Sequence, residues 1–373
     1  MKSEGTSKKK LKKVTEYTAC FAFLMFLQGV GAPMVFADAT TAINAKFEIL
    51  WNLISAVASF TLTNGEYKLE NSKTEKPTAS DQKPTESADT EPTVQKNHKR
   101  DKSTYYDSYG NHDGENKYTV EERTIGDTGT QVDNCFVKNK TGLSLDFDGL
   151  LSAKLPFSID KGINSPQVLI YHTHTSEAYL DEDVDFFYDS FYSRTNNNDF
   201  NVVAVGDALT EQLNKRGIKT VHDTTIHDES YNGSYDRSVD TVYKNLEKYP
   251  DIKVVIDLHR DAIGTDENKV KPVFTYNGKK GAQIMILAGC DTDGERGFDC
   301  WEENLNFALK IQDKAETLYP DMTRPLNFDY FAYNEYVCNG SLLIEVGTES
   351  NSIDEATYSG SLLGNAIADV LLN

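Results

Sequence analysis

From residue 167 onward, short apolar runs alternate with longer segments in which apolar residues recur every three or four positions. Continuous apolar runs are typical of strands buried on both faces, and the longer spacing is typical of amphipathic helices. We predict strands at residues 168–171, 218–221, 252–258, 283–288 and 342–346, and helices at residues 199–216, 235–249, 301–319 and 354–372. This alternation predicts one α/β domain at residues 161–373, with a single, mainly parallel, twisted sheet flanked by helices.

Local signals mark both ends of the first predicted helix. Asp199 is a suitable N-cap, because its carboxylate can accept a hydrogen bond from a free backbone N–H. Gly217 can take the left-handed conformation that commonly ends a helix. We therefore expect this helix to lie between these two residues.

The first 40 residues combine a lysine cluster with an apolar run from about residue 18 to residue 37. Lysines before such a run place the amino terminus in the cytoplasm, and the run is close to the length of a membrane span. Val35-Phe36-Ala37 also fits a signal-peptidase site, so a cleaved signal peptide is the alternative. We favour a retained transmembrane anchor; in both cases the remaining chain lies outside the cytoplasmic membrane.

Three further segments precede the α/β domain. Residues 41–70 form a second apolar stretch, which we expect beside the membrane. Residues 71–116 are polar, contain three prolines and lack periodicity, which predicts a disordered tether. Residues 117–160 contain short strand patterns separated by glycine turns, which predicts an N-terminal accessory β segment.

Charge and cysteine content exclude some functions. The formal net charge of −20 over 373 residues argues against nucleic-acid binding, which needs a basic surface. The five cysteines form no CxxC pair, so we expect neither a disulfide scaffold nor a thiolate zinc site. Cys290 and Cys300 could bridge a loop, but free thiols are the favoured interpretation.

Three of the predicted strands end in groups that bind metals or transfer protons. The first is followed by His172, His174 and Glu177, the third by His259, and the fifth contains Glu345. Because functional groups of α/β folds gather at the carboxyl ends of strands, we expect these side chains to meet. Two imidazoles and one carboxylate, here His174, His259 and Glu177, are an open three-ligand set for catalytic zinc.

The remaining candidates have less certain roles. Strand alternation would point His172 and His174 to the same side, so His172 is either a direct ligand or a group that supports one. Glu345 is the candidate general base, with Glu335 and Glu349 as substitutes, and a structural ion pair is its alternative role. Arg260 could neutralise an oxyanion or a substrate carboxylate, and a structural pair with Asp261 is its alternative role.

At these residues the sequence resembles the stage II sporulation protein P family. The resemblance rests on VLIYHTHTSEAY, YSRTNNNDFNVVAVGDALTEQLNKRG, VVIDLHRDAIG and SLLIEVGTESN, which lie between residue 167 and the end of the chain. The family is similar to zinc-dependent N-acetylmuramoyl-L-alanine amidases, in which two strands end in ligand histidines. His174 and His259 occupy these positions, and Glu345 occupies that of the catalytic glutamate on the last strand.

One departure from the amidase pattern concerns the carboxylate ligand. Amidases have a glutamate just before the first helix, where this chain has Arg194-Thr195-Asn196-Asn197-Asn198. We therefore assign this ligand to Glu177, whose spacing from His174 looks like the HxxE motif of zinc carboxypeptidases. The implied fold is amidase-like or zinc-carboxypeptidase-like.

The resemblance implies a zinc-dependent peptidoglycan hydrolase of sporulation. It would cleave the amide between muramic acid and L-alanine, with additional endopeptidase activity on cross-links. It would be a single-pass protein of the mother-cell membrane during engulfment, acting with stage II sporulation proteins D and M. A zinc peptidase that acts only on peptides and a non-catalytic peptidoglycan-binding scaffold are the alternatives.

Overall fold

The computed structural model describes residues 100–373. The predicted anchor, the membrane-proximal stretch and most of the predicted tether lie outside these residues. Within the described part, no helix is both long enough and apolar enough to cross a membrane. The four cysteines of this part, Cys135, Cys290, Cys300 and Cys338, are all free thiols.

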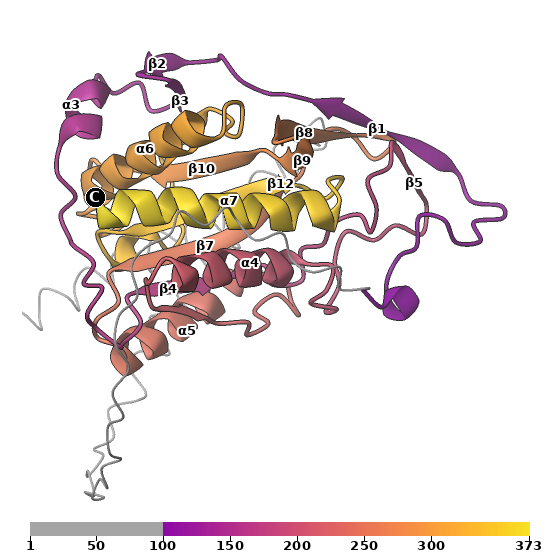
Figure 1. Ribbon diagram of the computed structural model, residues 1–373, viewed down its shortest axis with the longest axis horizontal. Coiled ribbons are helices and arrows are strands. Elements are labelled where there is room, and N and C mark those ends of the chain that lie inside the picture. Colours follow the sequence, from indigo (N-terminus) through magenta and orange to yellow (C-terminus); the bar gives the residue numbers. More distant parts are fainter. Residues whose placement is uncertain (1–99) are drawn as a thin grey trace, which may run out of the picture. The chain divides into compact units, whose positions relative to one another are not determined.

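The core of the domain is an eight-stranded sheet (Figure 1). Its strands, in spatial order, are β2 Thr130–Val132, β3 Cys135–Asn139, β11 Leu326–Asp329, β10 Ile284–Gly289, β12 Ser341–Thr348, β7 Val254–Asp261, β4 Val168–Tyr171 and β6 Thr220–His222. Strands β12, β7, β4 and β6 are parallel to one another, and so are β3, β11 and β10. The two groups meet antiparallel at β10 and β12.

The large sheet is mixed, and five of its seven strand pairs are parallel, which agrees with the prediction of a mainly parallel sheet. The prediction of a single sheet is wrong, because a second, four-stranded sheet has the order β5 Phe186–Tyr188, β1 Lys117–Arg123, β8 Asn268–Tyr276 and β9 Lys279–Ala282. An apolar strand pattern does not encode strand direction. Strands β8 and β9 form a hairpin through Asn277 and Gly278, which both have positive φ angles, as a two-residue type I′ turn requires.

The predicted helices are confirmed. They are α4 Val202–Lys215, α5 Ser234–Lys248, α6 Trp301–Leu318 and α7 Ile353–Leu372, joined by a short α3 Phe147–Ser152 and two 3₁₀ turns, η1 Lys102–Thr104 and η2 Glu335–Val337. Gly217 follows α4 with a φ of 85°, as expected. The N-cap of α4 is Asn201 instead of Asp199, because residues 197–200 form their own turn.

The two faces of the large sheet are covered differently. Helices α4, α6 and α7 pack on the face formed by Val168, Ile256 and Ile344, and in Figure 1 they lie in front of it. Helix α5 packs on the opposite face, against Leu169 and Tyr171 at the β4 side. Along β7 and β12 that second face carries the polar side chains.

The segments before β4 are integrated into both sheets. Strand β1 lies between β5 and β8, and β2 and β3 extend one edge of the large sheet. Residues 100–116, which we expected in the tether, are in contact with the domain. The Tyr105 ring stacks on Phe200, its hydroxyl donates to the Tyr179 carbonyl, and Ser108 donates to Asp181.

Candidate active site

His259 and Glu345 lie side by side on the face of the sheet that α4, α6 and α7 leave uncovered. His259 is on β7 and Glu345 on β12, and the two residues are register partners in this parallel pair. Their neighbours Leu258 and Ile344 point to the opposite face, into the main core. The alternation of each strand thus puts an imidazole and a carboxyl group next to each other above the sheet.

His174 joins this pair from the loop that follows β4. The strand ends at Tyr171, and residues 173–176 form a turn. The rings of His174 and His259 lie 5.4 Å apart, centroid to centroid, at an interplanar angle of 85°. His174 is buried, and its Nδ1 has no hydrogen-bond partner.

Glu177 lies against His259 on the same side. Its Oε2 is 3.3 Å from His259 Nδ1 and accepts a hydrogen bond from the Arg260 backbone N–H. Burial would raise the pKa of Glu177, but Arg260 and His259 reverse this effect and lower it to about 2. The structure therefore brings His174, Glu177 and His259 together and keeps the Glu177 carboxylate charged.

The Asp257 carboxylate contacts the His259 ring. The sequence analysis did not predict this contact. Asp257 Oδ1 forms an ion pair with His259 Nε2 at 2.8 Å. Burial lowers the pKa of His259, but Asp257 and Glu177 outweigh it and raise this pKa well above its ordinary value. Thr173 donates two hydrogen bonds to the Asp257 carboxylate and fixes it.

The structure does not bring His172 to this group. Its Nδ1 bonds to the Leu258 carbonyl, and its Nε2 to His222 Nε2. Both rings lie under α4, where a Cβ on Gly206 would come within 3.0 Å of His172 Nε2. The chain turns after His172, so the alternation expected from residue 172 to residue 174 does not continue.

Glu345 has the environment of a proton carrier. Its Oε2 is buried without a hydrogen-bond partner. Burial raises its pKa to about 8, with further contributions from the Asp261 and Glu177 carboxylates and opposition from His259. Its alternative role as an ion-pair partner is not seen in the described residues, since Arg324 pairs with Asp261 at 2.7 Å.

The two substitutes for Glu345 are engaged elsewhere. Glu349 pairs with Lys269 at 2.7 Å. Glu335 accepts a hydrogen bond from the Gly289 N–H in the core. Glu345 is thus the candidate that faces the histidines.

Arg260 is fixed by backbone contacts. Its guanidinium donates to the carbonyl groups of Ala178 and Ser193, and its Nη1 lies 3.9 Å from Glu177 Oε1. It therefore ties the loop that follows β4 to β7 and places a positive charge behind Glu177. The expected pair with the Asp261 side chain is not formed.

We tested whether this set of side chains fits a metal ion. In residues 100–373, no group of three or more histidine, cysteine, aspartate or glutamate side chains is already spaced to hold one. However, two imidazoles and a carboxylate are the donor set of catalytic zinc. The buried Nδ1 of His174 has no hydrogen-bond partner, so this atom is available to bind a metal ion. A carboxylate behind a ligand histidine, as Asp257 is behind His259, is usual in such sites. The residues fit zinc.

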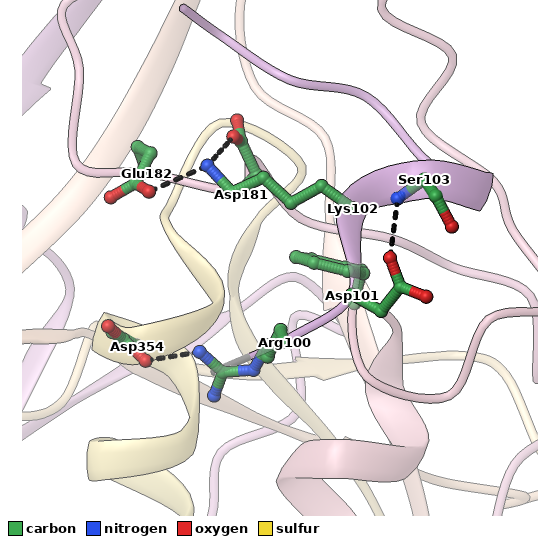
Figure 2. A pocket seen from close by; sticks show the side chains of 8 residues that line it. Arg100, Asp101, Lys102, Ser103, Asp181, Glu182 and Asp354 are labelled. Atoms are coloured by element: carbon green, nitrogen blue, oxygen red, sulfur yellow. Dashed lines mark hydrogen bonds and ion pairs between the residues drawn. The ribbon is translucent and has the colours of Figure 1, made fainter. Parts of the chain in front are cut away.

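A hollow of about 750 Å³ elsewhere on the domain contains none of these residues. Figure 2 shows that its charged side chains pair with one another: Arg100 with Asp354, and Lys102 with Asp181 and Glu182. Because its cations are already neutralised, we assign no ligand to it.

Comparison with known families identifies the family of this chain. The family model described as stage II sporulation protein P (SpoIIP) matches residues 46–368. The chain belongs to this family. It is 29% identical over 220 residues to stage II sporulation protein P of Bacillus subtilis (strain 168), an alignment that spans 54% of this chain and 49% of that relative. The chain thus matches about half the length of this curated relative.

Two amidases are among the solved structures with some similarity to this chain. N-acetylmuramoyl-L-alanine amidase AmiC2 of Nostoc punctiforme is 11% identical, with a TM-score of 0.32, over 58% of this chain and 97% of that chain. The CwlD amidase of Clostridioides difficile, solved with the GerS lipoprotein, is 14% identical, with a TM-score of 0.32, over 55% and 96%. At these scores we base no assignment on them.

Proposed function

We propose that this chain is a peptidoglycan hydrolase of sporulation that cleaves the amide between N-acetylmuramic acid and L-alanine. The observation that carries this proposal is the convergence of His174, Glu177 and His259 beside Glu345 in a chain of the SpoIIP family. Two imidazoles, a charged carboxylate and a second carboxyl group with a raised pKa are what metal-assisted amide hydrolysis requires.

In this proposal His174, Glu177 and His259 hold zinc, and His172 does not. When bound there, zinc supplies a Lewis acid and lowers the pKa of a bound water. Asp257 and Arg260 act as positioning residues. Asp257 fixes the orientation of the His259 ring, and Arg260 fixes Glu177.

Glu345 moves the proton. As a carboxylate it accepts the proton of the attacking water at its partnerless oxygen, Oε2. It then donates this proton to the nitrogen of L-alanine, which leaves as an amine. We replace the oxyanion role expected for Arg260 by the positioning of Glu177, because Arg260 Nε and Nη2 donate to backbone carbonyls and its Nη1 lies 3.9 Å from the Glu177 carboxylate.

The family and the sequence of the amino terminus support a proposal for the cellular setting. We propose a membrane-anchored enzyme of the mother cell whose domain acts on peptidoglycan outside the cytoplasmic membrane. Stage II sporulation proteins D and M are the proposed partners, and cleavage of cross-links is a proposed second activity. An anchor followed by a polar tether suits an enzyme that must reach a wall layer from the membrane.

The test combines a wall-digestion assay with metal analysis on the purified full chain. Glu345→Gln should keep the bound zinc of the wild type and lose release of stem peptides from sacculi, whereas Glu302→Gln, on the surface of α6, should change neither. Mass spectrometry of the digest should find free lactyl groups on the glycan. Only cut peptides, with all lactyl amides intact, would instead identify a peptidase, and near-normal activity of Glu345→Gln would remove this residue from the mechanism.

A further inference from the structure

A row of aromatic rings begins at His174 and leads away from it. Tyr231 stacks on the His174 ring, with centroids 4.8 Å apart and planes inclined by 4°. Tyr235 meets the same ring edge-on at 5.8 Å and stacks on Tyr333 at 5.2 Å. Tyr333 in turn contacts Phe331 at 4.8 Å. We call Tyr231, Tyr235, Tyr333 and Phe331 the tyrosine row.

The tyrosine row is partly open to solvent. Tyr231 is 65% exposed and Tyr333 37% exposed. Only seven large apolar residues are exposed in residues 100–373, and two of them belong to the row. Large rings that remain in water beside a site are commonly used for binding.

The structure holds the row in place. Asn334 donates to the Tyr235 carbonyl and to Ser238 Oγ, which ties the loop of Tyr333 to α5. A Cβ on Gly289 would collide with the Phe331 carbonyl, so the loop lies directly on the end of β10. Tyr333 itself has a φ of 40°, an unfavourable conformation for a tyrosine that tends to be kept where it serves a function.

The row is linked to the candidate base through the two histidines, since His174 contacts His259 and Glu345 is the register partner of His259. Burial raises the pKa of Tyr333, and the Glu345 carboxyl is its largest charged influence. The guanidinium of Arg194 lies 5.5 Å from the Tyr231 ring and is already paired with Asp228 at 2.7 Å. The side chains of the row themselves are flat rings and hydroxyl groups without charge.

We propose that the tyrosine row binds the sugar side of the substrate, the N-acetylmuramic acid ring of a glycan strand. This inference rests on the proposed function. In that substrate the amide is joined to the sugar through one lactyl group, so a surface that starts at His174 and Glu345 is within reach of the ring. A pyranose has flat C–H faces that pack on aromatic rings and hydroxyl groups that bond to phenols.

The other side of the amide fits this surface less well. The first stem-peptide residue is alanine, which offers only a methyl group to an aromatic ring. A neutral N-acetylated sugar also matches a row that carries no charge in a chain with a net charge of −20. The stem peptide would then extend to the opposite side of the site.

The test measures binding of glycan strands freed of stem peptides, with their lactyl carboxyl groups converted to neutral amides, to the purified full chain by isothermal titration calorimetry. Tyr231→Ala and Tyr333→Ala should each weaken binding about tenfold, whereas Tyr333→Phe, which keeps the ring, should remain within about twofold of the wild type. Tyr109→Ala, which removes an equally exposed ring that lies against Phe186, is the control and should bind normally. Thermal unfolding of each variant checks that it is folded. If Tyr333→Ala does not fold, Tyr231→Ala still tests the inference.

Two results would overturn the inference. One is wild-type binding of glycan strands by both alanine variants. The other is loss of affinity for free stem peptide, with affinity for the glycan unchanged. This binding assay needs no hydrolysis, so it is independent of the proposed function. If the alanine variants bind glycan more weakly but the wild type releases no peptide from sacculi, the sugar subsite is kept and the proposed function is rejected.

Discussion

Glu345 lies directly opposite His259 across the parallel strands β12 and β7, with both side chains on the sheet face that α4, α6 and α7 leave open. Two β-strand neighbours are held by the backbone ladder, so their spacing does not depend on a flexible loop. For the proposed role of Glu345 as a base, this fixed position means that little reorganisation is needed when the proton is transferred.

The contact between Asp257 and His259 predicts that Asp257→Asn lowers metal affinity. An asparagine keeps the size of the side chain but removes the negative charge that orients the His259 ring. Loss of such a supporting carboxylate typically weakens a zinc site by about 10–100-fold. Zinc titration with a competing chelator measures the effect, and Asp240→Asn on the exposed side of α5 is the control. Unchanged zinc affinity would contradict a supporting role for Asp257.

The buried Glu335 carboxyl predicts a pH-dependent stability. Burial raises its pKa well above the ordinary value of 4.5, so the folded protein holds this proton more tightly than the unfolded chain. The contribution of Glu335 to the free energy of unfolding is therefore most favourable below about pH 4.5, and it is lost as the pH rises through the folded-state pKa. Glu335→Gln does not titrate, so its stability should increase relative to the wild type as the pH rises above about 4.5, by up to about 1.4 kcal/mol per pH unit. Urea unfolding at several pH values tests this, and a stability difference that does not change with pH would reject it.

The capping box of α7 predicts a loss of stability in Ser352→Ala. Ser352 Oγ accepts from the Glu355 N–H, and the Glu355 carboxylate accepts from the Ser352 N–H. Removing an N-cap of this kind costs about 0.5–2 kcal/mol. Ser361→Ala, in the middle of the same helix, should cost little, because alanine favours helix interiors. Equal effects in the two variants, measured by urea unfolding, would argue against the cap.

Two glycines with open surroundings differ in their backbone φ angle, so together they test backbone strain in the absence of steric contact. Gly217 has a φ of 85°, and no atom lies within 4 Å of the place where a Cβ would stand, so Gly217→Ala should destabilise through backbone strain alone, by about 1–2 kcal/mol. Gly126 is equally open but lacks a positive φ, so Gly126→Ala should be neutral or stabilise by up to about 1 kcal/mol. Thermal unfolding compares the two, and a similar melting temperature for both variants would contradict the assignment of Gly217 as the end of α4.

Much of the fold could be predicted because its signals are local. Apolar runs located β4, β7 and β12, helical spacing located α4 to α7, and Gly217 marked a helix end. Strand direction could not be predicted, because β10 has the same apolar pattern whether it runs parallel or antiparallel to β12. The hairpin of β8 and β9, despite its Asn277-Gly278 turn, and strand β11 were not recognised.

The sequence alone determined which chemical groups are available: His174, Glu177, His259 and Glu345 each stand at or near the end of an apolar strand. Only the tertiary structure decided how they combine. It turned the chain after His172, which put that ring under α4, and it placed Asp257 behind His259 and the tyrosine row beside His174. The physical reason is that strand and helix patterns arise from neighbours along the chain, whereas a site depends on side chains that only packing between distant segments brings together.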